Sequence, residues 1–344
     1  MDIDLAISII IQSFNNAIEG ESLEFDFHGG EIALAFNEIK YICEWTWSRA
    51  WKNDYVFHAT TNGTLIHGNI KEWFSNNHYR FSLGLSLDGT SEMHNKNRSN
   101  SYSFIDLPFF LKSWPNQSVK MTISPLTISS VDKGIIDIVE KGFKLTANLA
   151  YGQKWEGAHL RKEYRLALSR LVEYYLSNPE LEVCNLIGMN LSEIGKKVLL
   201  NLPNTHKKWC GCGENMKCYS IDGKTYPCQM FNPSSNKFQD SNILDNLPIN
   251  NIPVNGCEMC DMLPSCPSCY GYGFITKGEI SKAPDELCDF RKIEAFASSY
   301  IYGCMLQNPT KYKTTRGLTN NQIACITMGI KTIQTNYKDF VFSF

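Results

Sequence analysis

Two cysteine-rich stretches stand out in the sequence: CGCGENMKCYSIDGKTYPC, from Cys210 to Cys228, and CEMCDMLPSCPSC, from Cys257 to Cys269. Together with Cys288 they hold nine of the thirteen cysteines in a chain of 344 residues. Cysteines at this density indicate disulfides, zinc sites or iron–sulfur clusters. The C-x2-C pairs suit zinc, and eight thiolates fill two zinc sites or two four-iron clusters equally well. The number of ligands alone therefore leaves zinc and iron–sulfur open.

The opening segment and the overall charge bear on compartment and partners. MDIDLAISIIIQ has acidic residues where a signal peptide would be basic, and no apolar run in the sequence is long enough to cross a bilayer. We therefore expect a cytoplasmic protein without membrane attachment, in which disulfides are rare. A net charge of −2 and 43% hydrophobic residues predict a sizeable core and no nucleic-acid partner.

Upstream of the cysteines, short apolar strand patterns alternate with helical patterns. The five predicted strands lie within residues 23–27, 55–63, 79–89, 119–126 and 142–151. Such alternation predicts βα units around a parallel sheet. Five repeats are too few for a closed eight-fold barrel, so the pattern favours a partial barrel or a doubly wound sheet. In both folds, functional residues collect where strands end.

Glycine-containing or polar segments follow four of these strands. They are His28–Glu31, Thr61–Gly63, Ser86–Gly89, and Thr122 with Ser124. The paired Gly29 and Gly30 would let a ligand approach the backbone closely. Taken alone, Gly29–Glu31 favours a tight turn with a solvated Glu31, Ser86–Gly89 is also typical of a turn, and Arg98 would be a surface arginine.

The composition and periodicity of the sequence change after about Asn201. Helical periodicity gives way to Pro, Gly, Asn and Cys, which predicts a small domain of loops held by cysteines, with a hairpin at Asp222-Gly223. We expect a barrel-like domain at residues 1–200, a cysteine-rich domain at 201–292 and a helical extension at 293–344.

The cysteine spacing resembles that of radical S-adenosylmethionine (SAM) enzymes with a C-terminal SPASM domain. Gly223-x4-Cys228 is followed by Cys257-x2-Cys260-x5-Cys266, then by Cys269 and Cys288. One spacing departs from the family pattern, because two residues rather than three separate Cys266 from Cys269.

The strand-end segments are similar to motifs of the same family. Gly29–Glu31 matches its GGE motif, Thr61–Gly63 its TNG strand end, and Ser86–Gly89 its S-[IL]-D-G. Arg98 stands about a dozen residues after Ser86, as the family's SAM-binding arginine does.

This resemblance implies an α/β fold with a partial (β/α)6 barrel, followed by a small cysteine-rich SPASM-like domain. It implies that SAM binds at Gly29, Gly30, Glu31, Asn62, Ser86, Asp88 and Arg98. It also implies two auxiliary 4Fe–4S clusters, the outer one bound by Cys257, Cys260, Cys266 and Cys288. The inner one would be bound by Cys228 and Cys269 with two of Cys210, Cys212 and Cys218. The expected activity is modification of a peptide or protein substrate by 5′-deoxyadenosyl radical chemistry.

Two departures from the family limit this expectation. The C-x3-C-x2-C motif that holds the SAM-cleaving cluster is absent from the sequence, so the chain is either truncated upstream or has lost that site. Gln229 stands where the sulfatase-maturing branch has an acidic base, and Ile32 where the family usually has proline. The alternatives are a non-catalytic, cluster-bearing partner or scaffold for a complete radical SAM subunit, and a zinc-stapled structural module.

Overall fold

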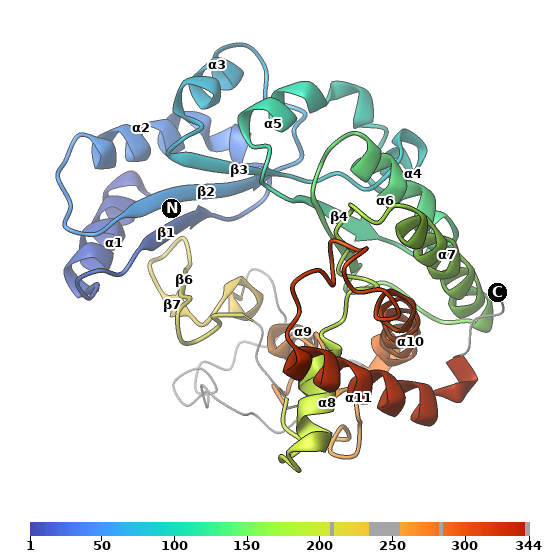
Figure 1. The fold of residues 1–344 in the computed structure, drawn as a ribbon. Coiled ribbons are helices and arrows are strands. Elements are labelled where there is room, and N and C mark those ends of the chain that lie inside the picture. The colour runs from blue at the N-terminus through green and yellow to red at the C-terminus, as the bar shows by residue number, and fades with distance from the viewer. Residues whose placement is uncertain (207–209, 234–254, 282–284, 341–344) are drawn as a thin grey trace. The chain divides into compact units, whose positions relative to one another are not determined.

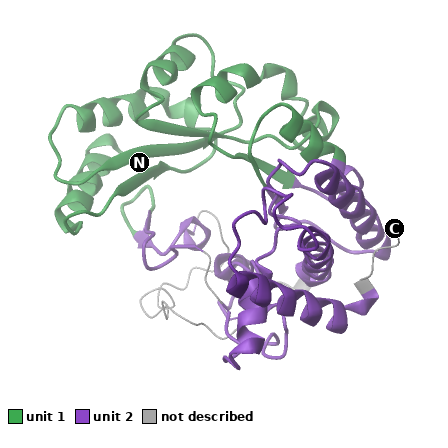
Figure 2. Cartoon of the chain, in the orientation of Figure 1, with its two compact units in different colours: residues 1–122, 133–146, 219–224 green, residues 123–132, 147–218, 225–344 purple. Residues whose placement is uncertain are grey.

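The computed structural model describes residues 1–206, 210–233, 255–281 and 285–340, so parts of the predicted cysteine-rich domain lie outside the described residues. The chain forms two compact units, shown in separate colours in Figure 2. Unit 1 comprises Met1–Thr122, Lys133–Thr146 and Tyr219–Lys224. Unit 2 comprises Ile123–Asp132, Ala147–Cys218 and Thr225–Phe344.

Three parallel strands form the centre of unit 1, in the order β1-β2-β3 (Figure 1). The strands are β1 (Leu23–Phe27), β2 (Tyr55–Thr61) and β3 (Phe81–Leu85). Alternate residues of each strand point to one face, where Phe57 and Phe81 are fully buried. Phe27 stacks on both rings, with centroids 5.6 and 6.2 Å away. This aromatic face is why the alternating pattern of the sequence folds as a half-buried sheet.

Helices alternate with the strands of unit 1, and the first helix precedes the first strand. They are α1 (Ile3–Asn16), α2 (Phe36–Trp47), α3 (Gly68–Asn77), α4 (Ser91–Asn97) and α5 (Leu107–Ser113). The periodicity did not predict the short α4. Its N-cap is Thr90, whose hydroxyl accepts a hydrogen bond from the Met93 N–H at 3.3 Å.

Two further strands, β4 (Val119–Ile123) and β5 (Leu145–Leu149), pair with each other, with α6 (Val131–Glu140) between them in the chain. A β-bridge between Ser86 and Lys120 connects the end of β3 to β4. The predicted α/β fold, with strands and helices alternating through the first 150 residues, is confirmed.

Unit 2 is mainly helical, and none of the helices in the described part of the chain is long and apolar enough to span a membrane. Its helices are α7 (Ala158–Ser177), α8 (Leu191–Leu199), α9 (Tyr270–Lys277), α10 (Cys288–Met305) and α11 (Asn320–Asn336). The predicted hairpin is present as β6 (Cys218–Tyr219) and β7 (Thr225–Tyr226), with Gly223 at a φ of 81° in the turn.

The helices α8 and α11 touch through their backbones. A Cβ placed on Gly195 would lie 1.7 Å from the Cys325 carbonyl oxygen, and one on Gly329 would lie 2.2 Å from that of Leu191. Only glycine fits at either position, so this pair of glycines sets how closely the C-terminal helix packs.

Candidate functional site

Glu31 connects the segments that follow β1 and β2 in unit 1. Its carboxylate accepts hydrogen bonds from the Thr61 hydroxyl at 2.6 Å, the Asn62 N–H at 2.8 Å and the Ala33 N–H at 3.1 Å. Asn62 in turn accepts from the N–H and the hydroxyl of Thr64. The GGE and TNG segments, 30 residues apart in the chain, are therefore held together by one carboxylate.

Gly29 and Gly30 leave space beside this carboxylate. Both are exposed, and a Cβ on either would meet nothing within 4 Å. The backbone at this strand end is therefore uncrowded, and ligand binding there stays a prediction.

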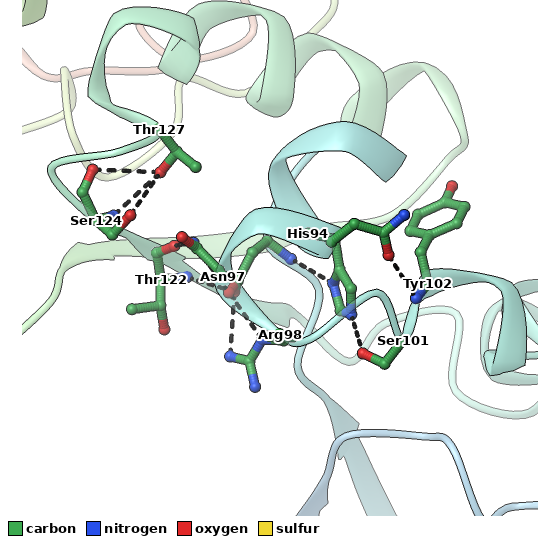
Figure 3. Close-up of polar contacts among 10 residues, drawn as sticks. His94, Asn97, Arg98, Ser101, Tyr102, Thr122, Ser124 and Thr127 are labelled. Carbon is green, nitrogen blue, oxygen red and sulfur yellow. Dashed lines mark hydrogen bonds and ion pairs between the residues drawn. The ribbon is translucent and has the colours of Figure 1, made fainter.

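Asp88 is the centre of a second polar network, at the end of β3. It is 1% exposed, and its carboxylate accepts from Arg98 through Nε at 2.7 Å and Nη2 at 3.1 Å. The same carboxylate accepts from the Thr122 N–H at 2.8 Å and from Asn97 Nδ2 at 3.3 Å. Figure 3 shows Asn97, Arg98 and Thr122 around this carboxylate, whereas the His94 ring bonds the Asp88 N–H. Asp88 is therefore a turn residue whose buried carboxylate also holds Asn97, Arg98 and the Thr122 backbone at the end of β3.

The buried His94 ring completes this network. Its Nδ1 accepts a hydrogen bond from the Asp88 N–H at 3.2 Å, and its Nε2 lies 3.1 Å from the Ser101 hydroxyl. Burial lowers the pKa of His94 to about 4, although the Asp88 carboxylate opposes the shift. The ring is therefore neutral at pH 7, with Nδ1 as the acceptor. No sequence motif singled out His94, and the unpredicted α4 is what places it there.

Ser86 directly follows β3, and Arg98, the C-cap residue of α4, reaches the same strand end through its bonds to Asp88. The Ser86 N–H donates to the Thr61 carbonyl at 2.9 Å, which joins the S-x-D-G segment to the end of β2. Arg98 uses two of its five N–H donors on Asp88, and its side chain is 27% exposed. Six of the seven predicted SAM-binding residues thus follow three neighbouring strands, and the seventh, Arg98, follows α4 and is joined to them through Asp88.

A cavity of about 60 Å³ in unit 2 is lined by cysteines. The four predicted outer ligands, Cys257, Cys260, Cys266 and Cys288, all line it, together with Cys269. A single water needs about 10–15 Å³ of such space, so this cavity has room for a larger group. Among the described residues, no three His, Cys, Asp or Glu side chains converge on the position of a single metal ion. The five thiols line a space larger than a single water needs, so the residues present fit a 4Fe–4S cluster.

Burial and one neighbouring charge act in opposite directions on the thiols of the cavity. Burial raises the pKa of Cys266 and of Cys269 above that of a free thiol, so an isolated thiolate would be costly there. Arg291, which also lines the cavity, opposes this shift at Cys266. Burial alone would lower the pKa of Arg291, but Glu294, with an oxygen 2.7 Å away, raises it above its usual value. A fixed positive charge therefore borders the cysteine cavity.

A second group of cysteines lies in the same unit. The side chains of Cys210 and Cys228 both hydrogen-bond that of Cys212, and the charges of Cys210 and Cys228 act on Cys269. Cys228 is buried beside Phe231 and Phe274, which form an apolar wall. Four of the five cysteines considered for the inner cluster are thus brought together, and Cys218 lies in β6. The assignment of ligands to the two clusters stays a prediction.

His206 and the two tyrosines near the cysteines are held by specific contacts. His206 Nδ1 lies 2.8 Å from the Tyr270 hydroxyl, and its Nε2 contacts the Cys266 carbonyl and the Ser268 hydroxyl. The Tyr272 hydroxyl donates to Glu286 at 2.7 Å and accepts from the Gly152 N–H. These bonds fix the three side chains beside the cysteines.

Comparison with models of protein families gives no match. The chain is similar to a cysteine-type anaerobic sulfatase-maturating enzyme of Clostridium perfringens, with 25% identity over 230 residues. This match covers 60% of the chain and 59% of the relative, so the chain spans about three fifths of that protein's length.

Solved structures of anSMEcpe share the fold. One with bound AdoMet has a TM-score of 0.60 at 20% identity, covering 95% of this chain and 90% of that one. Another, with bound AdoMet and the Cp18Cys peptide, has a TM-score of 0.50 at 20% identity, covering 97% and 89%. The resemblance inferred from the cysteines and the strand ends is confirmed: the chain is a relative of radical SAM proteins of the SPASM type and has their fold.

Proposed function

We propose that this chain is a radical SAM iron–sulfur protein of the SPASM type that takes part in modifying a peptide or protein substrate. The observation that carries the proposal is the cavity of unit 2, where five cysteines of the SPASM pattern meet beside a buried arginine. Similarity to a sulfatase-maturating enzyme supports the same assignment. We further propose that the protein is cytoplasmic, where its thiols stay reduced.

The described residues fit both groups that this function needs. We propose that SAM lies against the exposed Gly29 and Gly30, with the Glu31 carboxylate and the remaining N–H donors of Arg98 available to its polar groups. Two auxiliary 4Fe–4S clusters would take the cysteines of unit 2, and when bound they supply one-electron redox chemistry. The residues of this chain orient SAM, exclude water from the cysteines and set the charge around them.

The substrate class follows from the relatives together with one residue of this chain. A peptide is bound in a structure of anSMEcpe, and the curated relative is named for acting on sulfatases. Gln229, directly after Cys228, has no ionisable group and takes up no proton at neutral pH. We therefore propose a peptide modification that needs no carboxylate base at this position.

Iron and sulfide analysis of the anaerobically reconstituted protein tests the metal assignment. We expect about eight irons and as many sulfides per chain, for two 4Fe–4S clusters. The double variant Cys260→Ala/Cys266→Ala should retain about half of the iron. The control is Cys43→Ala, because Cys43 is a fully buried thiol of unit 1 and should not affect iron content. Zinc without sulfide in the wild-type protein would support the structural-module alternative instead.

A second candidate is a cluster-bearing partner of a complete radical SAM enzyme, because the sequence carries no C-x3-C-x2-C motif. Incubating the reduced, reconstituted protein with SAM separates the two candidates. Formation of 5′-deoxyadenosine by this chain supports an enzyme. SAM binding without cleavage, with cleavage appearing only in a chain extended upstream to include the motif, attributes the missing step to that segment. SAM binding without cleavage in both chains supports the partner.

A further inference from the structure

The residue that follows the C-terminal helix α11 touches a cysteine of the unit 2 cavity. The hydroxyl oxygen of Tyr337 lies 3.6 Å from Sγ of Cys260, within hydrogen-bonding distance for sulfur. A tyrosine hydroxyl carries its proton at neutral pH and can donate it to sulfur. No cysteine pattern in the sequence pointed to Tyr337, which stands 77 residues after Cys260.

Both helices of the close-packed pair hold the loop that carries Cys260. Asp261, the next residue, accepts a hydrogen bond from Asn336 Nδ2 at 2.7 Å, and Asn336 is the last residue of α11. Lys197 of α8 lies 3.7 Å from the other oxygen of the same carboxylate. Because Gly195 and Gly329 bring the two helices into backbone contact, the position of Tyr337 relative to Cys260 is fixed from two sides.

We propose that Tyr337 is a positioning residue of the outer cluster, which donates a hydrogen bond to the Cys260 sulfur and raises the reduction potential of that cluster. The proposal rests on the proposed function, since it requires a cluster at Cys260. Hydrogen bonds to ligand sulfur are one of the means by which a protein sets cluster potential. The direction follows from charge, because a donor stabilises the reduced, more negative form more than the oxidised one.

The test is Tyr337→Phe, which removes the donor and keeps the ring. The reconstituted protein is titrated anaerobically, and the clusters are followed by electron paramagnetic resonance. We expect unchanged iron content and a lower midpoint potential for one cluster. The ratio of reduced to oxidised cluster at fixed potential should fall by up to about tenfold, which corresponds to about 59 mV for a one-electron couple.

Tyr312→Phe is the matched control, because Tyr312 is a buried tyrosine of the same C-terminal region whose ring lies 5.0 Å from Lys311 Nζ. Its midpoint potentials should equal those of the wild type. Asn336→Ala is a second variant, which keeps the Tyr337 hydroxyl but removes a tether, and it should shift the same midpoint in the same direction by less. Full iron content with an unchanged midpoint in Tyr337→Phe would overturn the inference. Absence of iron from the wild-type protein would instead overturn the proposed function.

Discussion

Each unit contains an ion pair with a buried carboxylate beside its candidate site. The two pairs differ in whether the cation reaches solvent. In unit 1, Asp88 is buried and bound by Arg98 at 2.7 Å, with side-chain exposures of 2% and 27%. In unit 2, Arg291 and Glu294 are also 2.7 Å apart, but their side chains are only 10% and 4% exposed. The first pair keeps its cation at the surface, whereas the second removes both charges from water.

This difference in exposure indicates that the two ion pairs have different roles. The Asp88 carboxylate gathers donors from α4 and β4, so its charge is used within the protein to order the ends of strands. A fully buried pair is a weak source of stability, because desolvation offsets much of the attraction. Arg291 borders the cysteine cavity, and a cluster with four thiolates is anionic, so the guanidinium gains a second partner when the cavity is filled. We infer that the unit 1 pair orders the strand ends and holds Arg98, and that the unit 2 pair places a positive charge beside the proposed cluster.

The largest effect is expected from Arg291→Met. This change leaves the buried Glu294 carboxylate with the Tyr164 hydroxyl, 2.7 Å away, in place of its cation. Removing one partner of a buried pair costs about 3–5 kcal/mol, and we expect the free energy of unfolding to fall by that amount, with less iron retained. Urea denaturation followed by circular dichroism measures the first effect, and iron analysis the second.

Lys292→Met is the matched control for Arg291→Met. Lys292 also lines the cavity, but its side chain is 31% exposed and its partner Asp289 is 43% exposed. Its loss should cost no more than about 1 kcal/mol. If the two variants behave alike, the position of Arg291 beside the cysteines has no special role and the contrast between the two pairs is lost.

Acid is expected to weaken unit 1 through His94. Its folded pKa is about 4, below the value of about 6.5 for an unfolded histidine. Between these values the unfolded chain takes up a proton that the folded chain does not, so stability falls as the pH drops from 6.5 towards 4. The shift corresponds to at most about 3 kcal/mol, all of it present above pH 6.5.

Tryptophan fluorescence measures this loss, because five of the seven tryptophans, Trp45, Trp47, Trp51, Trp73 and Trp114, belong to unit 1. Urea midpoints are compared at pH 7 and pH 4.5 for the wild type and for His94→Gln, which does not titrate in this range. The variant should be less stable at pH 7 and should lose less stability on acidification. Equal losses in both proteins would show that other groups cause the acid sensitivity.

The sequence predicted more of unit 1 than of unit 2, for physical reasons. Alternating apolar residues and glycine turns are local signals, so neighbouring residues alone predicted the strands and the GGE, TNG and S-x-D-G ends. The hydrogen bonds that join those strand ends were not predicted. The bond from the Thr61 hydroxyl to Glu31 spans 30 residues, and the bond from the Thr122 N–H to Asp88 spans 34. Cysteine spacing likewise marked the stretch that supplies the five thiols of the unit 2 cavity, whereas their assignment to clusters stays a prediction.

The sequence did not predict that Arg291 and Tyr337 lie beside those thiols, for a different reason. Arg291 lies on an ordinary helical pattern, and Tyr337 follows one, so neither differs locally from a surface residue. The glycines at 195 and 329 interrupt helical patterns, where glycine is unfavourable, and such interruptions signal close packing when the cause is a neighbouring backbone. That signal was present in the sequence, although the identity of the partner helix was not.

The smallest effect is expected from Asp88→Asn, which keeps the shape and removes the charge. The bonds from Arg98 and from the Thr122 N–H lose their ionic character, and we expect a loss of about 1.5–3 kcal/mol in unit 1. The control is Asp106→Asn, because Asp106 pairs with Lys71 at partly exposed positions, and asparagine caps a helix as well as aspartate does. Its cost should stay below about 1 kcal/mol.

SAM affinity, measured by equilibrium dialysis, should fall in Asp88→Asn because Arg98 is no longer held, and should be unchanged in Asp106→Asn. If Asp88→Asn lowers stability but leaves SAM affinity intact, the unit 1 pair is purely architectural, and Arg98 is removed from the proposed binding set.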